Sequence, residues 1–147
     1  KNSQIRAEFQ PASILGGCQI HAGQIGGCNG GTIEDLRKAA KMTEGKQLKL
    51  GFRLTVCPAT SSDYIKAMEE GIITTFIDFG AQISAAGDHS VVKQGAGAMG
   101  PDELLLTTGL YTFAGCMGCE DARVMTASVE TIMNASFDLP ESSGKEA

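Results

Sequence analysis

Short apolar segments alternate with amphipathic ones along most of the chain. Residues 52–58, "FRLTVCP", are β-branched and almost wholly apolar, which is typical of a strand buried on both faces. Residues 103–108 and 122–128 have the same character, and a shorter strand is expected at residues 24–26. Residues 73–84 are ambiguous, because their first half has helical spacing and "AQIS" at the end fits a short strand.

Amphipathic segments between these strands predict three helices. Residues 33–43 begin after Thr32, a good N-cap, carry two acidic residues in the first turn and stop before Gly45. A second helix is predicted at 62–70 and a third at 129–137. Strands that alternate with helices of about ten residues favour βαβ crossovers and a parallel sheet.

The predicted fold is therefore α/β, with three layers: a mainly parallel sheet flanked by helices on both faces. We divide the chain into an irregular leading segment (1–22), an α/β domain (23–137) and a polar tail (138–147). The glycine-rich residues 87–100 are expected to form a loop. In sheets of this kind, ligands bind beyond the carboxyl ends of the strands.

Composition narrows the class of protein further. The chain has 147 residues, 42% of them hydrophobic, which suffices for one sizeable core. Its net charge of −5 repels phosphate backbones and anionic lipid, so neither nucleic acid nor a membrane is expected as a partner. No apolar run is long enough to span a bilayer, and we expect a cytoplasmic protein. Because the sequence starts at Lys1 and ends in a polar tail, we expect a piece of something longer.

A cysteine stands in a glycine run directly before the first predicted helix, in "GGCNGGT". This loop follows the strand at 24–26, so Cys28 is expected to face the ligand crevice beside a helix N-terminus, where the dipole favours thiolates and anions. The alternative is a small buried side chain among glycines that permit a tight turn. The other cysteines are expected to be reduced thiols.

Several stretches resemble one enzyme family. "IGGCNGGTIEDLRKAA", "GFRLTVCPATSSDYIKAMEEG", "GAQISAAG" and "ELLLTTGLYTFAGCMGCEDARVMTASVETIMNAS" are similar, in one register, to the aconitase family, and most closely to the large subunits of 3-isopropylmalate dehydratase and homoaconitase. The resemblance implies the third α/β domain of a hydro-lyase. It also implies partners, namely the remaining large-subunit domains and a swivelling small subunit or domain, and a small hydroxy di- or tricarboxylic acid as substrate.

The resemblance further implies a 4Fe-4S cluster held by three cysteines, with Cys28 at the position of the first. The family's other two cysteines form a Cys-x-x-Cys pair about sixty residues downstream, where this sequence has Asp88 and Val91. Asp88 is a weak iron ligand and Val91 is none. The family therefore implies a cluster, but two of the three ligand positions in this chain are not cysteines.

The family's substrate-binding stretch is also altered. Its two arginines are replaced within "LYTFAGC", residues 110–116, so the bidentate carboxylate clamps are lost. Thr107, Thr108 and Tyr111 remain as candidates for lining the substrate crevice.

A new Cys-x-x-Cys, Cys116 to Cys119, follows this stretch. With Cys28 it could supply three cluster ligands or, together with Asp88 or His89, part of a zinc site; the alternative is two loop thiols without a metal. Three functions therefore stay open: a piece of an aconitase-type hydro-lyase, inactive as an isolated chain; a non-catalytic homologue used for binding or assembly; and a thiol or metal site that uses these cysteines.

Overall fold

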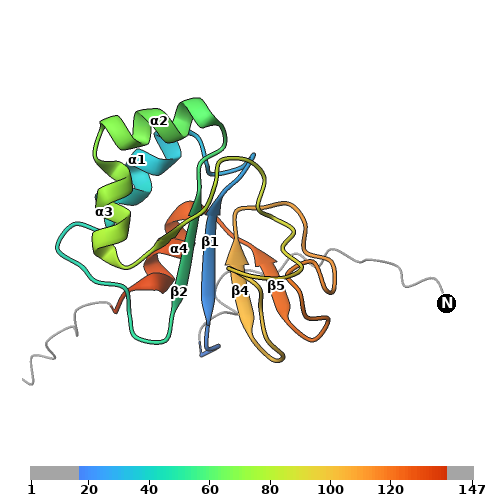
Figure 1. Cartoon of the computed structure of the whole chain (residues 1–147). Coiled ribbons are helices and arrows are strands. Elements are labelled where there is room, and N and C mark those ends of the chain that lie inside the picture. The colour runs from blue at the N-terminus through green and yellow to red at the C-terminus, as the bar shows by residue number, and fades with distance from the viewer. Residues whose placement is uncertain (1–16, 139–147) are drawn as a thin grey trace, which may run out of the picture.

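The computed structural model describes residues 17–138 and contains one sheet of five parallel strands in the order β3-β2-β1-β4-β5 (Figure 1). The elements in chain order are β1 (Ala22–Gly26), α1 (Ile33–Met42), β2 (Arg53–Cys57), α2 (Ser61–Glu69), α3 (Ile72–Phe79), β3 (Gln82–Ile83), β4 (Leu104–Thr107), β5 (Arg123–Thr126) and α4 (Val129–Ser136). The predicted α/β class with a parallel sheet flanked by helices is confirmed. Of the residues predicted as ambiguous, the first half forms α3 and the end forms β3.

Three of the helices begin at side-chain caps that the sequence displays. The Thr32 hydroxyl accepts the Asp35 N–H at 3.4 Å at the start of α1, and Thr60 accepts the Asp63 N–H at 3.1 Å at the start of α2. Ser128 caps α4 in the same way. The Asp63 carboxylate also accepts the Ile33 N–H at 3.1 Å, so the beginnings of α1 and α2 are held together. Local capping therefore explains where these helices start.

All four helices lie on one side of the sheet: α4 packs on β1 and α3 beside β3, while α2 packs on α1 and α3. That face presents Ile25 of β1, Leu54 and Val56 of β2 and Leu106 of β4 to a core cluster that contains residues from every helix. Phe76 of α3 is fully buried at its centre. Strand residues alternate between faces, so the neighbours of these side chains point the other way.

The opposite face is covered by irregular chain rather than by helices. Ala22 of β1 and Leu105 of β4 pack there against Val92 and Met99 from the loop before β4 and against Met117 from the loop after it. Figure 1 shows these yellow and orange segments in front of the strands, with α4 behind them. The expectation of helices on both faces is thus corrected for residues 17–138. This layer contains glycines with positive φ, such as Gly97 at 91° and Gly118 at 100°, which oppose helix formation, and its packing on the sheet decides that it covers this face.

The chain changes direction across the sheet at β1. From β1 the chain adds β2 on one side, and later returns to place β4 on the other side. Such a switch point opens a crevice at the carboxyl end of the central strand. The expected domain start at residue 23 lies one residue inside β1, while residues 1–16 and 139–147 of the leading segment and tail lie outside the described part. No helix in the described part is long and apolar enough to cross a bilayer.

Candidate active-site crevice

A pocket of about 90 Å³ lies at the switch point. It is formed by the loop after β1, by the segment around Asp88 and by the residues that follow β4. The lining residues are Gly26, Cys28, Asn29, Asp88, Ser90, Gly109, Leu110 and Tyr111. The prediction that Cys28 sits at the carboxyl end of its strand and faces a crevice is confirmed.

The loop that carries Cys28 depends on close backbone packing. Gly26 has φ of 123°, and a Cβ on it would lie 1.8 Å from the Cys57 carbonyl oxygen. The next amide, Gly27 N–H, donates to that same oxygen at 2.9 Å. A Cβ on Gly30 would similarly lie 2.8 Å from the Thr108 side chain. The glycines are therefore required for β1 to turn sharply into the Cys28 loop.

Thr108 connects this loop to the end of β4. Its hydroxyl accepts the Gly26 N–H at 2.9 Å and lies 2.6 Å from the Asn29 carbonyl oxygen, to which it donates. Thr107 donates to the Gln24 side-chain oxygen at 2.9 Å and accepts the Gly109 N–H at 2.9 Å. Both threonines are buried and neither lines the pocket. Their hydrogen bonds place them behind the pocket, where they shape it, and a contact with substrate stays a prediction.

We expect Thr108→Val to destabilise the fold by about 1–3 kcal/mol, because the buried Gly26 N–H and Asn29 carbonyl lose their partner. Urea unfolding followed by circular dichroism measures the change. The matched control is Thr74→Val on the exposed surface of α3, which should change stability by about 0.5 kcal/mol or less. Equal effects of the two substitutions would contradict the structural role given to Thr108.

Asp88 lies beside the Cys28 thiol in the pocket. The Cys28 Sγ atom is 3.7 Å from Asp88 Oδ2, a weak contact. The Asp88 carboxylate also accepts the Ser90 hydroxyl at 2.5 Å and the Ser90 N–H at 2.9 Å. These Ser90 bonds, opposed by partial burial, hold the pKa of Asp88 below its usual value, so Asp88 is a carboxylate at neutral pH.

Two buried groups hold the Asp88 segment over the sheet. Gln24 of β1 donates from its side-chain amide to the His89 carbonyl oxygen, so His89 is anchored through its backbone. The Cys57 thiol lies 3.2 Å from the Gly87 carbonyl oxygen and 3.3 Å from that of Ala85. Sequence reasoning missed Gln24, although a polar residue inside an apolar strand was a usable signal. Cys57, expected only as a strand residue, is seen to be part of this support.

The mouth of the pocket is apolar. Leu110 is 71% exposed and Tyr111 is 52% exposed, and both line the pocket. The prediction of Tyr111 at the crevice thus agrees with its position. Exposed side chains of this size beside a pocket are typical of surfaces that meet a ligand or another protein.

Cys116 and Cys119 lie in a different part of the structure from Cys28. Cys116 is fully buried in the cluster that covers the second face of the sheet, and Cys119 packs against that cluster. Cys28 is exposed and has Asp88 as its neighbour. Within residues 17–138, no group of three or more histidine, cysteine, aspartate or glutamate side chains is arranged to hold a metal ion. The proposed set of Cys28, Cys116 and Cys119 is therefore not assembled here.

The donor set at the pocket does not fit a 4Fe-4S cluster. Such a cluster needs three cysteine thiolates when one iron is left open to substrate. The pocket supplies one thiol, from Cys28, and one carboxylate, from Asp88. Val91, the other position where the resemblance implies a cysteine, is 43% exposed and has no donor atom in its side chain.

The arginines of residues 17–138 lie away from the pocket. Arg37 on α1 pairs with Glu70 and Arg53 at the start of β2 pairs with Glu103 at 2.7 Å. Arg123 begins β5, at the opposite end of the sheet from the pocket. Residues 17–138 therefore place no guanidinium in the pocket lining, which agrees with the lost carboxylate clamps.

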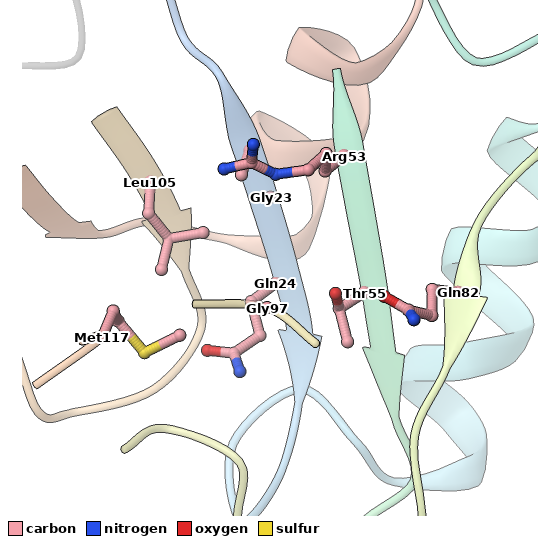
Figure 2. A pocket seen from close by; sticks show the side chains of 9 residues that line it. Gly23, Gln24, Arg53, Thr55, Gln82, Gly97, Leu105 and Met117 are labelled. Atoms are coloured by element: carbon pink, nitrogen blue, oxygen red, sulfur yellow. The ribbon is translucent and has the colours of Figure 1, made fainter. Parts of the chain in front are cut away.

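A second, much smaller cavity of about 20 Å³ lies under the irregular layer (Figure 2). Gln24 of β1, Thr55 of β2 and Gln82 of β3 contribute polar side chains to it, and Gly97 covers it. Its size matches about one water molecule. It is too small for a substrate and belongs to the packing of the loop layer against the sheet.

Comparisons with known proteins agree with this architecture. The family described as "Aconitase family (aconitate hydratase)" matches residues 1–138. The chain is 39% identical over 106 residues to the 2,3-dimethylmalate dehydratase large subunit of Eubacterium barkeri, covering 72% of this chain and 25% of that protein. It is 33% identical over 119 residues to the homoaconitase large subunit of Methanocaldococcus jannaschii, covering 81% and 28%.

A third relative is the 3-isopropylmalate dehydratase large subunit of Caldicellulosiruptor saccharolyticus, 38% identical over 104 residues, with 71% of this chain and 24% of the relative covered. The chain thus spans about a quarter of the length of the curated relatives it matches. The family match, the extent of these alignments and the parallel sheet with its crevice agree. The chain belongs to the aconitase family.

Proposed function

We propose that this chain is the α/β domain of an aconitase-type hydro-lyase large subunit that acts on a hydroxy di- or tricarboxylic acid such as 3-isopropylmalate. The observation that carries the proposal is the loop "GGCNGG", which places Cys28 in a pocket at the switch point of a family-matched sheet. The relatives support the reaction class, since those named above are large subunits of dehydratases or of homoaconitase.

Charge indicates that the complete site needs partners. The substrate is a polyanion, while the pocket is lined by the Asp88 carboxylate and by no arginine or lysine among the described residues. Cationic groups must then come from outside residues 17–138. We propose that the remaining large-subunit domains and a small subunit supply them, which fits the large-subunit names of the relatives. The isolated chain is expected to be inactive.

The chain's own residues suggest a limited chemical role. Family dehydratases generally carry a 4Fe-4S cluster, but the pocket of this chain supplies one thiol and one carboxylate, which do not match one. The Asp88 carboxylate can accept a hydrogen bond from a substrate hydroxyl, although its lowered pKa makes it a weak base. Leu110 and Tyr111 at the mouth can exclude water once a partner domain closes over them.

The proposal is tested on the whole large subunit that contains this chain, expressed with its small subunit. We expect dehydration of 3-isopropylmalate, 2,3-dimethylmalate or a related hydroxy acid, measured as absorbance of the unsaturated product. Cys28→Leu should lower kcat/KM by about a hundredfold, because the larger side chain fills part of the pocket and shifts the substrate from its position. Cys18→Leu, at an exposed position outside the pocket lining, is the matched control and should leave the rate unchanged.

A second function, as a non-catalytic homologue, is favoured by Asp88 and Val91, which stand where the family has cysteines. A homologue that has lost cluster ligands and carboxylate clamps can retain the sheet for binding or assembly, using the apolar mouth formed by Leu110 and Tyr111. An assembled, folded complex that turns over none of the acids would contradict the hydro-lyase proposal and support this alternative.

A further inference from the structure

We propose that Cys116 and Cys119 are a reversible modification site, at which a low-molecular-weight disulfide such as glutathione disulfide converts the two thiols into an intrachain disulfide. The site lies in the loop between β4 and β5, in the layer that covers the second face of the sheet. It does not involve Cys28 and does not depend on the proposed hydro-lyase function.

The chain reverses direction around the two cysteines. The Cys116 N–H donates to the Phe113 carbonyl at 3.0 Å, and the Gly118 N–H donates to the Gly115 carbonyl at 3.2 Å. The chain bends at Gly118, whose φ is 100°. These bonds close two overlapping turns, at residues 113–116 and 115–118, and the bend at Gly118 follows directly, so the chain is folded back rather than extended between the two cysteines. A disulfide needs Cα atoms within about 7 Å, which a folded-back segment of four residues can reach and an extended one, at about 10 Å, cannot.

Both cysteines belong to one apolar cluster, but they differ in access. Cys119 is partly exposed, whereas Cys116 is fully buried among side chains that include Met117 and Val92. The contact of the Cys116 Sγ atom with the Tyr111 carbonyl oxygen is long, at 3.6 Å. A reagent from solvent therefore meets Cys119 first, and Cys116 is positioned to react second.

The chemistry balances as two exchange steps. The Cys119 thiolate attacks one sulfur of the small disulfide, forms a mixed disulfide and releases one small thiol. The Cys116 thiolate then attacks the Cys119 sulfur, forms the intrachain bond and releases the second small thiol. Two protein thiols are oxidised and one small disulfide is reduced. The protons lost by the cysteines are taken up by the departing small thiolates.

Burial gives the second step a pH dependence. Loss of solvent raises the pKa of the Cys116 thiol, and the nearby Lys93 ammonium, which donates to the Gly115 carbonyl at 2.9 Å, opposes this only in part. Below its pKa, the thiolate fraction of a cysteine increases about tenfold for each pH unit. Ring closure should therefore be slow at neutral pH and accelerate as the pH rises.

The disulfide would also act on the loop that carries Asp88. The Cys116 carbonyl accepts the Val92 N–H at 2.9 Å, and the Met117 carbonyl accepts the Met99 N–H at 2.8 Å. These two bonds join the cysteine turn to the glycine-rich residues 87–100, which include Asp88. Fixing the turn by a covalent bond should therefore slow opening of the whole irregular layer.

The test treats the full chain with glutathione disulfide at several pH values, blocks residual thiols with an alkylating reagent and maps the peptides by mass spectrometry. We expect the peptide with Cys116 and Cys119 to lose two hydrogen masses and to regain them with a dithiol reductant. Closure should speed up about tenfold per pH unit. Hydrogen exchange of the Val92 and Met99 amides should slow in the oxidised chain.

Single variants distinguish the thiol that reacts first, Cys119, from the thiol that closes the disulfide, Cys116. Cys116→Ser should stop at a stable mixed disulfide on Cys119, and Cys119→Ser should leave Cys116 unmodified. A triple variant with Cys18, Cys28 and Cys57 changed to serine should close as the unmodified chain does, and if it does not fold, peptide mapping of the unmodified chain decides. A mixed disulfide on Cys119 that never closes, even at high pH, would overturn the proposal, and so would pairing of Cys119 with Cys28.

Discussion

Replacing Asp88 and Val91 together by cysteine should convert a chain that takes up little iron and sulfide into one that assembles a 4Fe-4S cluster. The unmodified pocket offers a single thiol, Cys28, and its neighbour at 3.7 Å is the Asp88 carboxylate. The double substitution supplies a Cys-x-x-Cys pair on the segment that already lies against Cys28. Three thiolates then become available, as a cluster with one open iron requires.

The measurement is anaerobic reconstitution followed by iron and sulfide analysis and visible absorbance. Asp88→Ser with Val91→Ser is the matched control, because it changes the same positions without adding a thiol. Asp88→Cys alone should give little cluster, since two thiolates are too few. A full cluster in the unmodified chain would contradict the conclusion that its pocket supplies too few thiolates. If that cluster were lost in Cys116→Ser, the loop with Cys116 must fold back toward Cys28 during assembly.

Gly26→Ala should unfold most of the protein. A Cβ at this position would lie 1.8 Å from the Cys57 carbonyl oxygen and 2.6 Å from its carbon. Neither strand can move away easily, because Gly26 pairs with Cys57 in the register of β1 and β2. The residue also needs φ of 123°, which an L-amino acid rarely adopts. We expect a loss of more than about 4 kcal/mol, a large part of a typical total stability.

The control for this prediction is Gly45→Ala after α1. Gly45 also has positive φ, 69°, but a Cβ there meets nothing within 4 Å. The cost should therefore be limited to the backbone conformation, about 1–2 kcal/mol. Urea unfolding of both variants measures the difference. A Gly26→Ala chain as stable as Gly45→Ala would show that the β1–α1 turn can adjust, contrary to the packing described.

Local signals explain why so much of the fold could be predicted. Caps at Thr32, Thr60 and Ser128 mark helix starts within the sequence itself, and the apolar run around Leu54 and Val56 needs burial on both faces. These features depend on residues a few positions apart. The parallel sheet followed from them, and with it the position of Cys28 at the carboxyl end of its strand, whereas the strand order with its switch at β1 did not.

The candidate site was predictable only in part. Resemblance placed Asp88 in register with a cluster cysteine, and the structure brings it to Cys28, sixty residues away in the chain. The hydrogen bonds of Thr107 and Thr108 were not predictable, because a threonine on a strand gives no sign of which distant backbone groups it will meet. Gln24 could have been noticed as a polar residue inside an apolar strand, but its partner and that of Cys57 lie in a loop whose course has no periodic signal.

By itself, the sequence determined three of the four helices, four of the five strands, the parallel α/β class and the loop that presents Cys28, because each rests on periodicity, capping or glycine conformation over a few residues. Tertiary structure alone decided that irregular chain covers the second face of the sheet and that Cys116 is buried there, away from the exposed thiol of Cys28. The physical reason is that glycine-rich segments have many allowed backbone conformations. Long-range packing of Val92, Met99 and Met117 on the sheet selects one of them.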